Sequence, residues 1–248
     1  MRCHELVTNL NTLLAVEQFK DDCPNGLQIE GDNGELHKII CGVSLSQALI
    51  DVALAQHATV IIVHHGVFWH KSEYPLVGVK YQRVAKIIKN DINLLAYHLP
   101  LDNHAELGNN AQLARLLNLR VVGQTGVQNL IWYGELNNPC SLATFVAQYQ
   151  QLTGHAPRCF GNSQKIIKRI AWCSGGADNL FEGAINLAVD CYLTGEAKEP
   201  IMNLALESGV AFISGGHYVS ERYGIMALTT YLQGLGLDAE FVELYNPL

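Results

Sequence analysis

Residues 59–65 read Thr59-Val60-Ile61-Ile62-Val63-His64-His65, an apolar run that ends in two adjacent histidines. A short apolar run rich in β-branched residues predicts a buried strand. Adjacent side chains at the end of a strand can both turn toward one pocket, and two imidazoles there are a ligand pair for a divalent metal ion. A single histidine after a strand is more commonly a hydrogen-bonded structural residue. The adjacent pair therefore predicts metal binding by His64 and His65.

The segments around this run alternate between strand and helix patterns. Strands are predicted at 38–43, 59–63 and 92–96, and helices at 46–56 and 83–90. This alternation is typical of α/β proteins with a largely parallel sheet. We therefore expect an α/β fold.

The chain also aligns with itself. Residues 38–65 align without gaps on 169–196, and residues 81–102 align on 200–221 once the loop 66–80 is set against 197–199. The register places His65 on Glu196, His98 on His217 and Asp102 on Glu221. Any two strand-helix-strand units share such apolar positions, but the coincidence of metal-binding residue types favours an internal duplication.

The duplication predicts three parts. These are a first α/β half at 1–121 with the repeat copy 38–121, a connecting or second-layer segment at 122–168, and a second α/β half at 169–248 with the copy 169–242. Open α/β sheets bind ligands outside the carboxyl ends of their strands. We therefore expect the two pseudo-duplicated halves to present their ligands to one cleft between them.

Two further segments place a carboxylate four residues after a histidine: His98 with Asp102, and His217 with Glu221. His217 and Glu221 are expected on one face of a helix, either as ligands or as a surface charge pair. Pro100 argues against a regular helical interior in the other segment, so Asp102 is the stronger ligand there. His98 is left open between a ligand, a partner that orients a carboxylate, and a proton carrier.

Glu196 rests only on the self-alignment, and we expect it to be structural or to support a ligand. The loop 66–80 holds aromatic and basic residues directly after the histidine pair. Its side chains either cover the site, stacking on a ring or pairing with phosphate, or pack against a neighbouring subunit. They are Phe68, Trp69, His70, Lys71, Tyr74 and Lys80.

Composition narrows the class of protein. The 248 residues, 49% of them hydrophobic, are enough for one large or two smaller globular domains. No apolar run reaches the roughly 18–20 residues of a membrane span. Seven scattered cysteines without a C-x-x-C pair indicate a reducing compartment, so we expect a cytoplasmic protein. The net charge of -7 disfavours broad contact with nucleic acid.

Several spaced motifs resemble the Nif-three-like family, often labelled GTP cyclohydrolase I type 2 homologues. They are Pro24-Asn25-Gly26-Leu27-Gln28, Val63-His64-His65-Gly66, His98-Leu99-Pro100-Leu101-Asp102, Gly108-Asn109-Asn110, Thr194-Gly195-Glu196 and Gly216-His217 with Glu221-Arg222. They span the chain in one order. The resemblance implies two intertwined α/β domains, a dinuclear divalent-metal centre and a ring-shaped homohexamer built as a trimer of dimers. The metal ligands that it implies are His64, His65, Asp102, His217 and Glu221.

Five ligands are too many for a closed tetrahedral site but suit two metal ions with a bridging carboxylate and open water positions. Two such ions can activate a water for hydrolysis. We therefore expect a metal-dependent hydrolase of a small, nucleotide-like substrate, with Asp102 or Glu221 bridging and His98 as the catalytic proton carrier. Only the family label supports opening of the imidazole ring of the GTP base, because the same site could equally well hydrolyse a phosphoester or an amide. A non-catalytic metal-handling or scaffold ring is the alternative, and the choice among Zn, Fe and Mn is open.

Overall fold

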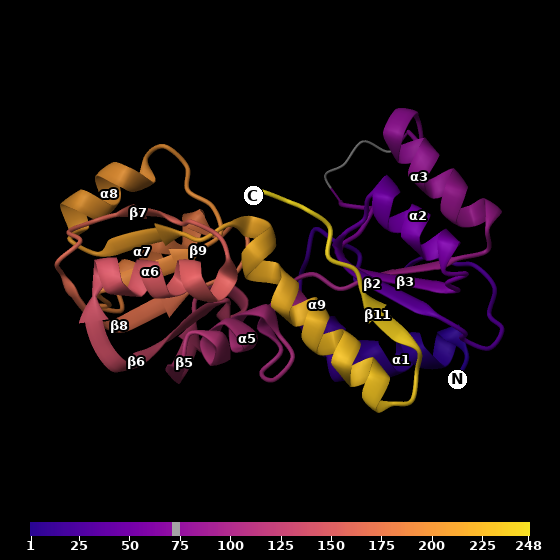
Figure 1. The fold of residues 1–248 in the computed structure, drawn as a ribbon, viewed down its shortest axis with the longest axis horizontal. Coiled ribbons are helices and arrows are strands. Elements are labelled where there is room, and N and C mark those ends of the chain that lie inside the picture. Colours follow the sequence, from indigo (N-terminus) through magenta and orange to yellow (C-terminus); the bar gives the residue numbers. More distant parts are fainter. Residues whose placement is uncertain (71–74) are drawn as a thin grey trace. The chain divides into compact units, whose positions relative to one another are not determined.

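The computed structural model describes residues 1–70 and 75–248 and contains two β-sheets with helices on their faces (Figure 1). The expected α/β fold is confirmed. Lys71 and Tyr74, two of the loop residues singled out above, lie outside the described residues. The chain forms two compact units, unit 1 (Met1–Leu107 and Gly224–Tyr245) and unit 2 (Gly108–Tyr223 and Asn246–Leu248).

Unit 1 is built on a five-stranded sheet in the order β1-β4-β3-β2-β11. The strands are β1 (Gly26–Ile29), β2 (Ile39–Ser44), β3 (Val60–His65), β4 (Asn93–Ala96) and β11 (Ala239–Phe241). All neighbours pair in parallel except β1, which is antiparallel to β4. Residues 60–64 are fully buried, as expected for a central parallel strand with both faces covered.

Helices cover both faces of this sheet (Figure 1). On one face, α2 (Gln47–Ala55) and α3 (Gly78–Lys89) pack against the strands through Leu49 and Ile87. On the other, α1 (Cys3–Leu13) and the C-terminal part of α9 (His217–Gly234) pack through Leu10 and Leu228. Ser46 caps α2 by accepting a hydrogen bond from the Leu49 N–H. The remaining elements are a short turn of 3-10 helix at Val16–Gln18 and α4 (Leu99–Asn103).

Unit 2 is built on a six-stranded sheet in the order β5-β6-β8-β9-β10-β7. The strands are β5 (Leu119–Thr125), β6 (Ile131–Ser141), β7 (Arg158–Phe160), β8 (Ile166–Trp172), β9 (Cys191–Thr194) and β10 (Ala211–Ser214). β8, β9 and β10 are parallel, and the other three strands pair antiparallel.

The helices of unit 2 divide between two apolar clusters, one with α5 and α6 and one with α7 and α8. They are α5 (Asn109–Leu116), α6 (Leu142–Thr153), α7 (Phe181–Ile185) and α8 (Ile201–Ser208), with 3-10 turns at Val127–Asn129 and Asp178–Leu180. Within the described parts of the chain, none of the helices is both long and apolar enough to cross a membrane.

Both units repeat one arrangement of strands, which supports the predicted duplication. Three adjacent parallel strands, β2-β3-β4 in unit 1 and β8-β9-β10 in unit 2, follow one another along the chain with helical segments between them. In each case an antiparallel strand pairs with the third, β1 with β4 and β7 with β10.

A helix that comes after the third strand of each unit belongs to the other unit. Residues of α5, which follows β4 and the short α4, belong to unit 2, and residues 224–234 of α9, which follows β10, belong to unit 1. The unit boundaries at 107 and 223 therefore differ from the sequence-based boundaries at 121 and 168. Residues 122–168 supply strands and a helix to unit 2. Apolar periodicity marks the face of α5 that is buried, but it carries no information on which sheet that face covers.

Candidate metal centre

His64 lies near the end of β3, where a hydrogen bond to the main chain of Tyr97 fixes its ring. Its side chain is fully buried, and its Nδ1 lies 2.8 Å from the carbonyl oxygen of Tyr97. A carbonyl oxygen can only accept, so Nδ1 carries the proton in this hydrogen bond. Nε2 is therefore the nitrogen of His64 that can bind a cation.

Asp102 presents a buried carboxylate to that nitrogen. Its Oδ2 lies 3.6 Å from Nε2 of His64. This separation is too long for a hydrogen bond, but two ligands each about 2.1 Å from one tetrahedral ion would lie about 3.4 Å apart. The donor types and their spacing therefore fit a shared divalent cation.

Asp102 reaches this position because residues after β4 form the single helical turn α4, with His98 at its N-cap. The N–H of Asp102 donates to the carbonyl of His98 over 3.0 Å. Pro100 lies in the first turn, where its missing N–H costs no hydrogen bond, so the turn forms around a proline that we expected to oppose it.

His65 and His98 lie beside His64. Ring centroids are 4.6 Å apart for His64 and His65, and 5.1 Å apart for His64 and His98. Nδ1 of His65 lies 3.0 Å from the Ser44 hydroxyl. One ligand atom from each of the three histidines lies within 4.8 Å of the others, so within the described residues this group could hold a metal ion.

Asp21 is a site residue that the sequence analysis missed. Its carboxylate accepts hydrogen bonds from Nδ1 of His98 over 2.8 Å and from the Leu99 N–H over 3.0 Å. The Asn25 side chain donates to Asp21 over 2.9 Å and accepts from the His98 N–H over 2.7 Å. Together these bonds fix the ring of His98 and the start of α4. Asn25 was visible only as part of a family motif, and no motif marked Asp21.

The pKa of Asp21 reflects this network. Burial raises the pKa, but the hydrogen bond and charge of His98, with hydrogen bonds from Asn25 and the Cys23 N–H, outweigh burial and lower it to about 2. Asp21 is therefore a carboxylate at neutral pH, and the proton in its bond to His98 resides on Nδ1 of His98. Nε2 of His98 is therefore the ring nitrogen that can bind a metal ion or exchange a proton beside His64 and His65.

Asp21→Asn is expected to lower the free energy of unfolding by about 1–3 kcal/mol at pH 7, because charge-assisted hydrogen bonds lose their anion. The folded pKa lies below the unfolded one, so this contribution is present above about pH 4 and is lost as the pH falls toward 2. Urea unfolding of both proteins at several pH values should show their difference narrowing toward pH 3. Asp22→Asn, at the neighbouring exposed carboxylate, is the control, and a difference independent of pH would contradict this account.

In unit 2, His217 opens helix α9 between two carboxylates. Its Nδ1 lies 2.6 Å from Oε1 of Glu196, and its Nε2 lies 3.1 Å from Oε2 of Glu221. Glu221 is buried and shares the helix face predicted from the i, i+4 spacing, so the pair is not a surface charge pair. Glu196 holds the ring of His217 from the other side. A carboxylate in that position orients a metal-ligating imidazole.

Glycine is required beside Glu221. Gly175 has φ +67, and a Cβ there would collide with Oε1 of Glu221. The Gly175 N–H donates to the Ser220 hydroxyl over 2.9 Å, and the preceding Ser174 N–H donates to the Asn110 side chain over 2.9 Å. Asn110, from the predicted Gly108-Asn109-Asn110 motif, is thus an anchor for the loop after β8.

The surroundings of His217 change its pKa. Burial lowers the pKa, but hydrogen bonds and charges from Glu221 and Glu196 outweigh burial and raise it to about 9. In the metal-free chain the imidazole is therefore cationic at neutral pH. A metal ion at Nε2 would replace that proton.

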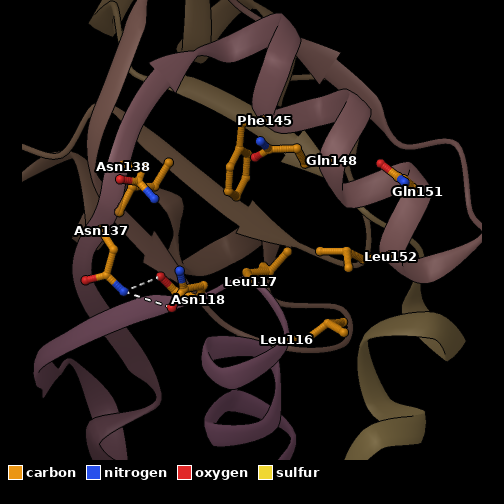
Figure 2. A pocket seen from close by; sticks show the side chains of 10 residues that line it. Leu116, Leu117, Asn118, Asn137, Asn138, Phe145, Gln148, Gln151 and Leu152 are labelled. Carbon is orange, nitrogen blue, oxygen red and sulfur yellow. Dashed lines mark hydrogen bonds between the residues drawn. The ribbon is translucent and has the colours of Figure 1, made fainter.

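A cavity of about 310 Å³ elsewhere in unit 2 offers a contrast (Figure 2). Its lining side chains are apolar or amides, from α5, β6, α6 and their flanking residues. The Asn137 amide donates to the backbone and side-chain oxygens of Asn118. Among the described residues, its lining holds no histidine and no carboxylate, in contrast to the surroundings of His64 and His217.

Comparison with known proteins agrees with the fold. A GTP cyclohydrolase 1 type 2 homolog of Neisseria meningitidis serogroup B is 44% identical over 247 residues, covering 99% of this chain and 98% of that protein. A solved structure described as protein ybgI, of unknown function, matches with TM-score 0.96 at 38% identity, and TTHA1606 of Thermus thermophilus matches with TM-score 0.90 at 32% identity. Both matches cover 100% of each chain. A model of the Duf34/NIF3 (NGG1p interacting factor 3) family matches residues 1–246, so the chain belongs to that family.

Proposed function

We propose that this protein binds two divalent metal ions per chain through His64, His65, Asp102, His217 and Glu221 and hydrolyses a small, nucleotide-like substrate with them. The observation that carries the proposal is the His64–Asp102 pair. Both side chains are buried, and the nitrogen of His64 that faces the carboxylate is the one that the Tyr97 bond leaves able to bind a cation. A cation between them would offset the cost of burying the carboxylate.

The unit 2 residues support the same proposal with a second imidazole–carboxylate pair, His217 and Glu221. Two pairs and His65 give five donors, which leaves coordination positions open for water and substrate. When bound, divalent ions of this kind lower the pKa of water and polarise substrate oxygens.

We assign proton transfer to His98. Its Nδ1–H is committed to Asp21, its backbone is held by Asn25, and its ring lies against those of His64 and His65. An imidazole fixed at one nitrogen can hold or deliver a proton at the other, which is the arrangement that general acid–base catalysis uses.

The substrate class rests on the relatives. The name GTP cyclohydrolase 1 type 2 homolog supports a nucleotide or related molecule as the substrate, and we extend this to the present chain. The donor set itself serves hydrolysis of rings, phosphoesters or amides.

The test is a substrate panel of purine nucleotides and phosphoesters, incubated with the metal-loaded chain and with Asp102→Asn. Turnover that needs the metal and disappears in the variant is expected. A protein that binds its metals and turns over nothing in the panel would contradict the hydrolase and favour a metal-handling role.

Metal binding is expected to release a proton from His217. Since its pKa is about 9, the ring is protonated at pH 8 in the metal-free chain and must lose that proton to bind a metal ion. Calorimetric titration in buffers of different ionisation enthalpy counts the protons released. Glu196→Gln removes one cause of the raised pKa without removing a proposed ligand, so it should release fewer protons at pH 8. Equal numbers of protons released by the wild type and Glu196→Gln would show that Glu196 does not raise the pKa of His217.

The cytoplasmic location and the homohexamer stay proposals. The seven cysteines form no disulfide within the described chain, which fits a reducing compartment. Light scattering on the purified chain measures its oligomeric state.

A further inference from the structure

A second cavity in unit 2 adjoins the proposed ligand His217. It has a volume of about 310 Å³, and its walls include His155, Arg158, Glu196, Gly216 and His217. We propose that this cavity, here called the Arg158 pocket, binds a phosphate group of the substrate. The inference rests on the proposed function, because it names the part of the substrate that lies beside the metal ligands.

Strand register places Arg158 at this point. β7 pairs antiparallel with β10, with Arg158 opposite Ser214, and β10 pairs in parallel with β9, with Ser214 opposite Thr194. Arg158 therefore lies at the carboxyl end of β10, where the chain turns through Gly215 and Gly216 into α9. The carboxyl ends of parallel strands are where open α/β sheets bind their ligands.

Close packing against glycines gives the pocket its shape. Gly216 has φ +96, and a Cβ there would lie 2.9 Å from Nε2 of His155. A Cβ on Gly195 would lie 2.6 Å from the Cα of His217. Because both positions lack a side chain, the imidazole of His155 can lie over the chain as it enters α9, and the turn after β9 can approach His217.

Arg158 gives the pocket a guanidinium that can bind an anion. The side-chain carboxylate in its lining, Glu196, is already paired with His217 over 2.6 Å. Within the described residues, no carboxylate lies at ion-pair distance from Arg158, so the charge of its guanidinium is not opposed there. The Tyr218 N–H at the start of α9 is already occupied by an oxygen of Leu248 at 3.0 Å, and Leu248 also lines the pocket, so a phosphate would be held there by Arg158 and His155.

Phosphate is the anion that this set of groups suits. A guanidinium donates two parallel hydrogen bonds to phosphate oxygens, and a nearby imidazole can add a third donor. The volume lies at the lower end of the range for small-molecule sites, which suits a phosphate with a short attached group. A substrate seated this way would have its phosphate in the pocket and its reacting atom toward His217.

The test measures binding of inorganic phosphate to the full chain by calorimetry, with metal content determined on each sample. Arg158→Gln is expected to weaken phosphate binding about tenfold or more, because charge-assisted hydrogen bonds are lost. Ala197→Leu, which narrows the pocket without changing its charge, should weaken binding as well. Arg169→Gln is the matched control, since Arg169 lies on β8 of the same sheet and does not line the pocket.

Three results would contradict phosphate binding by the Arg158 pocket. The first is equal phosphate affinity in Arg158→Gln and Arg169→Gln. The second is phosphate binding that a chelator abolishes but that Arg158→Gln leaves unchanged, and the third is no binding of millimolar phosphate by the wild-type chain.

A failure of the proposed function gives a different result. If the chain holds no metal but Arg158→Gln still weakens phosphate binding, the pocket stands and the metal-dependent hydrolase does not.

Discussion

Asp102→Asn is expected to weaken metal binding by about 100-fold or more and to leave the purified chain depleted of metal. The carboxylate of Asp102 is buried and faces Nε2 of His64 at 3.6 Å. An amide of the same shape keeps the packing but removes the negative charge that a buried cation requires. Metal content by plasma mass spectrometry and affinity by competition with a chelator measure the effect.

Asp178→Asn is the matched control for this substitution. Asp178 is buried to the same degree and pairs with Lys198 over 3.4 Å in unit 2, outside the proposed ligands. Its substitution should leave the metal content unchanged. A fall in metal content of similar size in both variants would show that loss of a buried carboxylate disturbs the fold generally, and the ligand role of Asp102 would be wrong.

Gly175→Ala is expected to remove metal by displacing the Glu221 carboxylate. A Cβ at this position collides with Oε1 of Glu221, which lies at the end of a flexible side chain and must move away. The positive φ of +67 adds backbone strain of about 1–2 kcal/mol for a residue with a Cβ. We therefore expect both a loss of stability of that size and a loss of metal.

Gly154→Ala separates these two effects. Gly154 ends α6 with φ +74, and a Cβ there meets nothing within 4 Å. This variant should lose a similar amount of stability, measured by urea unfolding of the metal-free proteins, and keep its metal. If Gly175→Ala also keeps its metal, the position of Glu221 does not matter for binding, and Glu221 is not a ligand.

The parallel core could be predicted from sequence because its strands are buried on both faces. Within the predicted strand 59–63, residues 60–63 are all apolar, and they form the first four residues of β3. α3 was harder to locate, since it begins at Gly78 instead of at 83. Its first turns expose Val79 and Tyr81, so they carry no apolar periodicity that a sequence pattern could reveal.

β6 shows a second reason why element boundaries are hard to predict. The apolar pattern at 130–136 predicts a strand that ends at 136, but the strand continues to Ser141 although it contains Pro139. Its pairing with β8 is irregular between Glu135 and Cys140, and such an irregularity tolerates a proline. Proline in a strand pattern therefore marked a bulge here instead of an end.

The candidate site could be predicted only where a residue type is itself informative. Adjacent histidines and the i, i+4 spacing of His217 and Glu221 identified residues that do lie together within their own units. Asp21 could not be found in this way, because it lies 77 positions from His98 in the sequence and one carboxylate in a polar loop has no distinguishing pattern. Tertiary structure alone joins them.

The most direct test of metal binding by this chain is the metal content of the untagged wild-type protein. Plasma mass spectrometry measures it after purification and again after addition of Zn, Mn or Fe. The proposed ligand set predicts about two ions per chain, bound tightly enough to survive desalting. A chain that is purified without metal and refuses all three added ions would contradict the metal site and the hydrolase built on it.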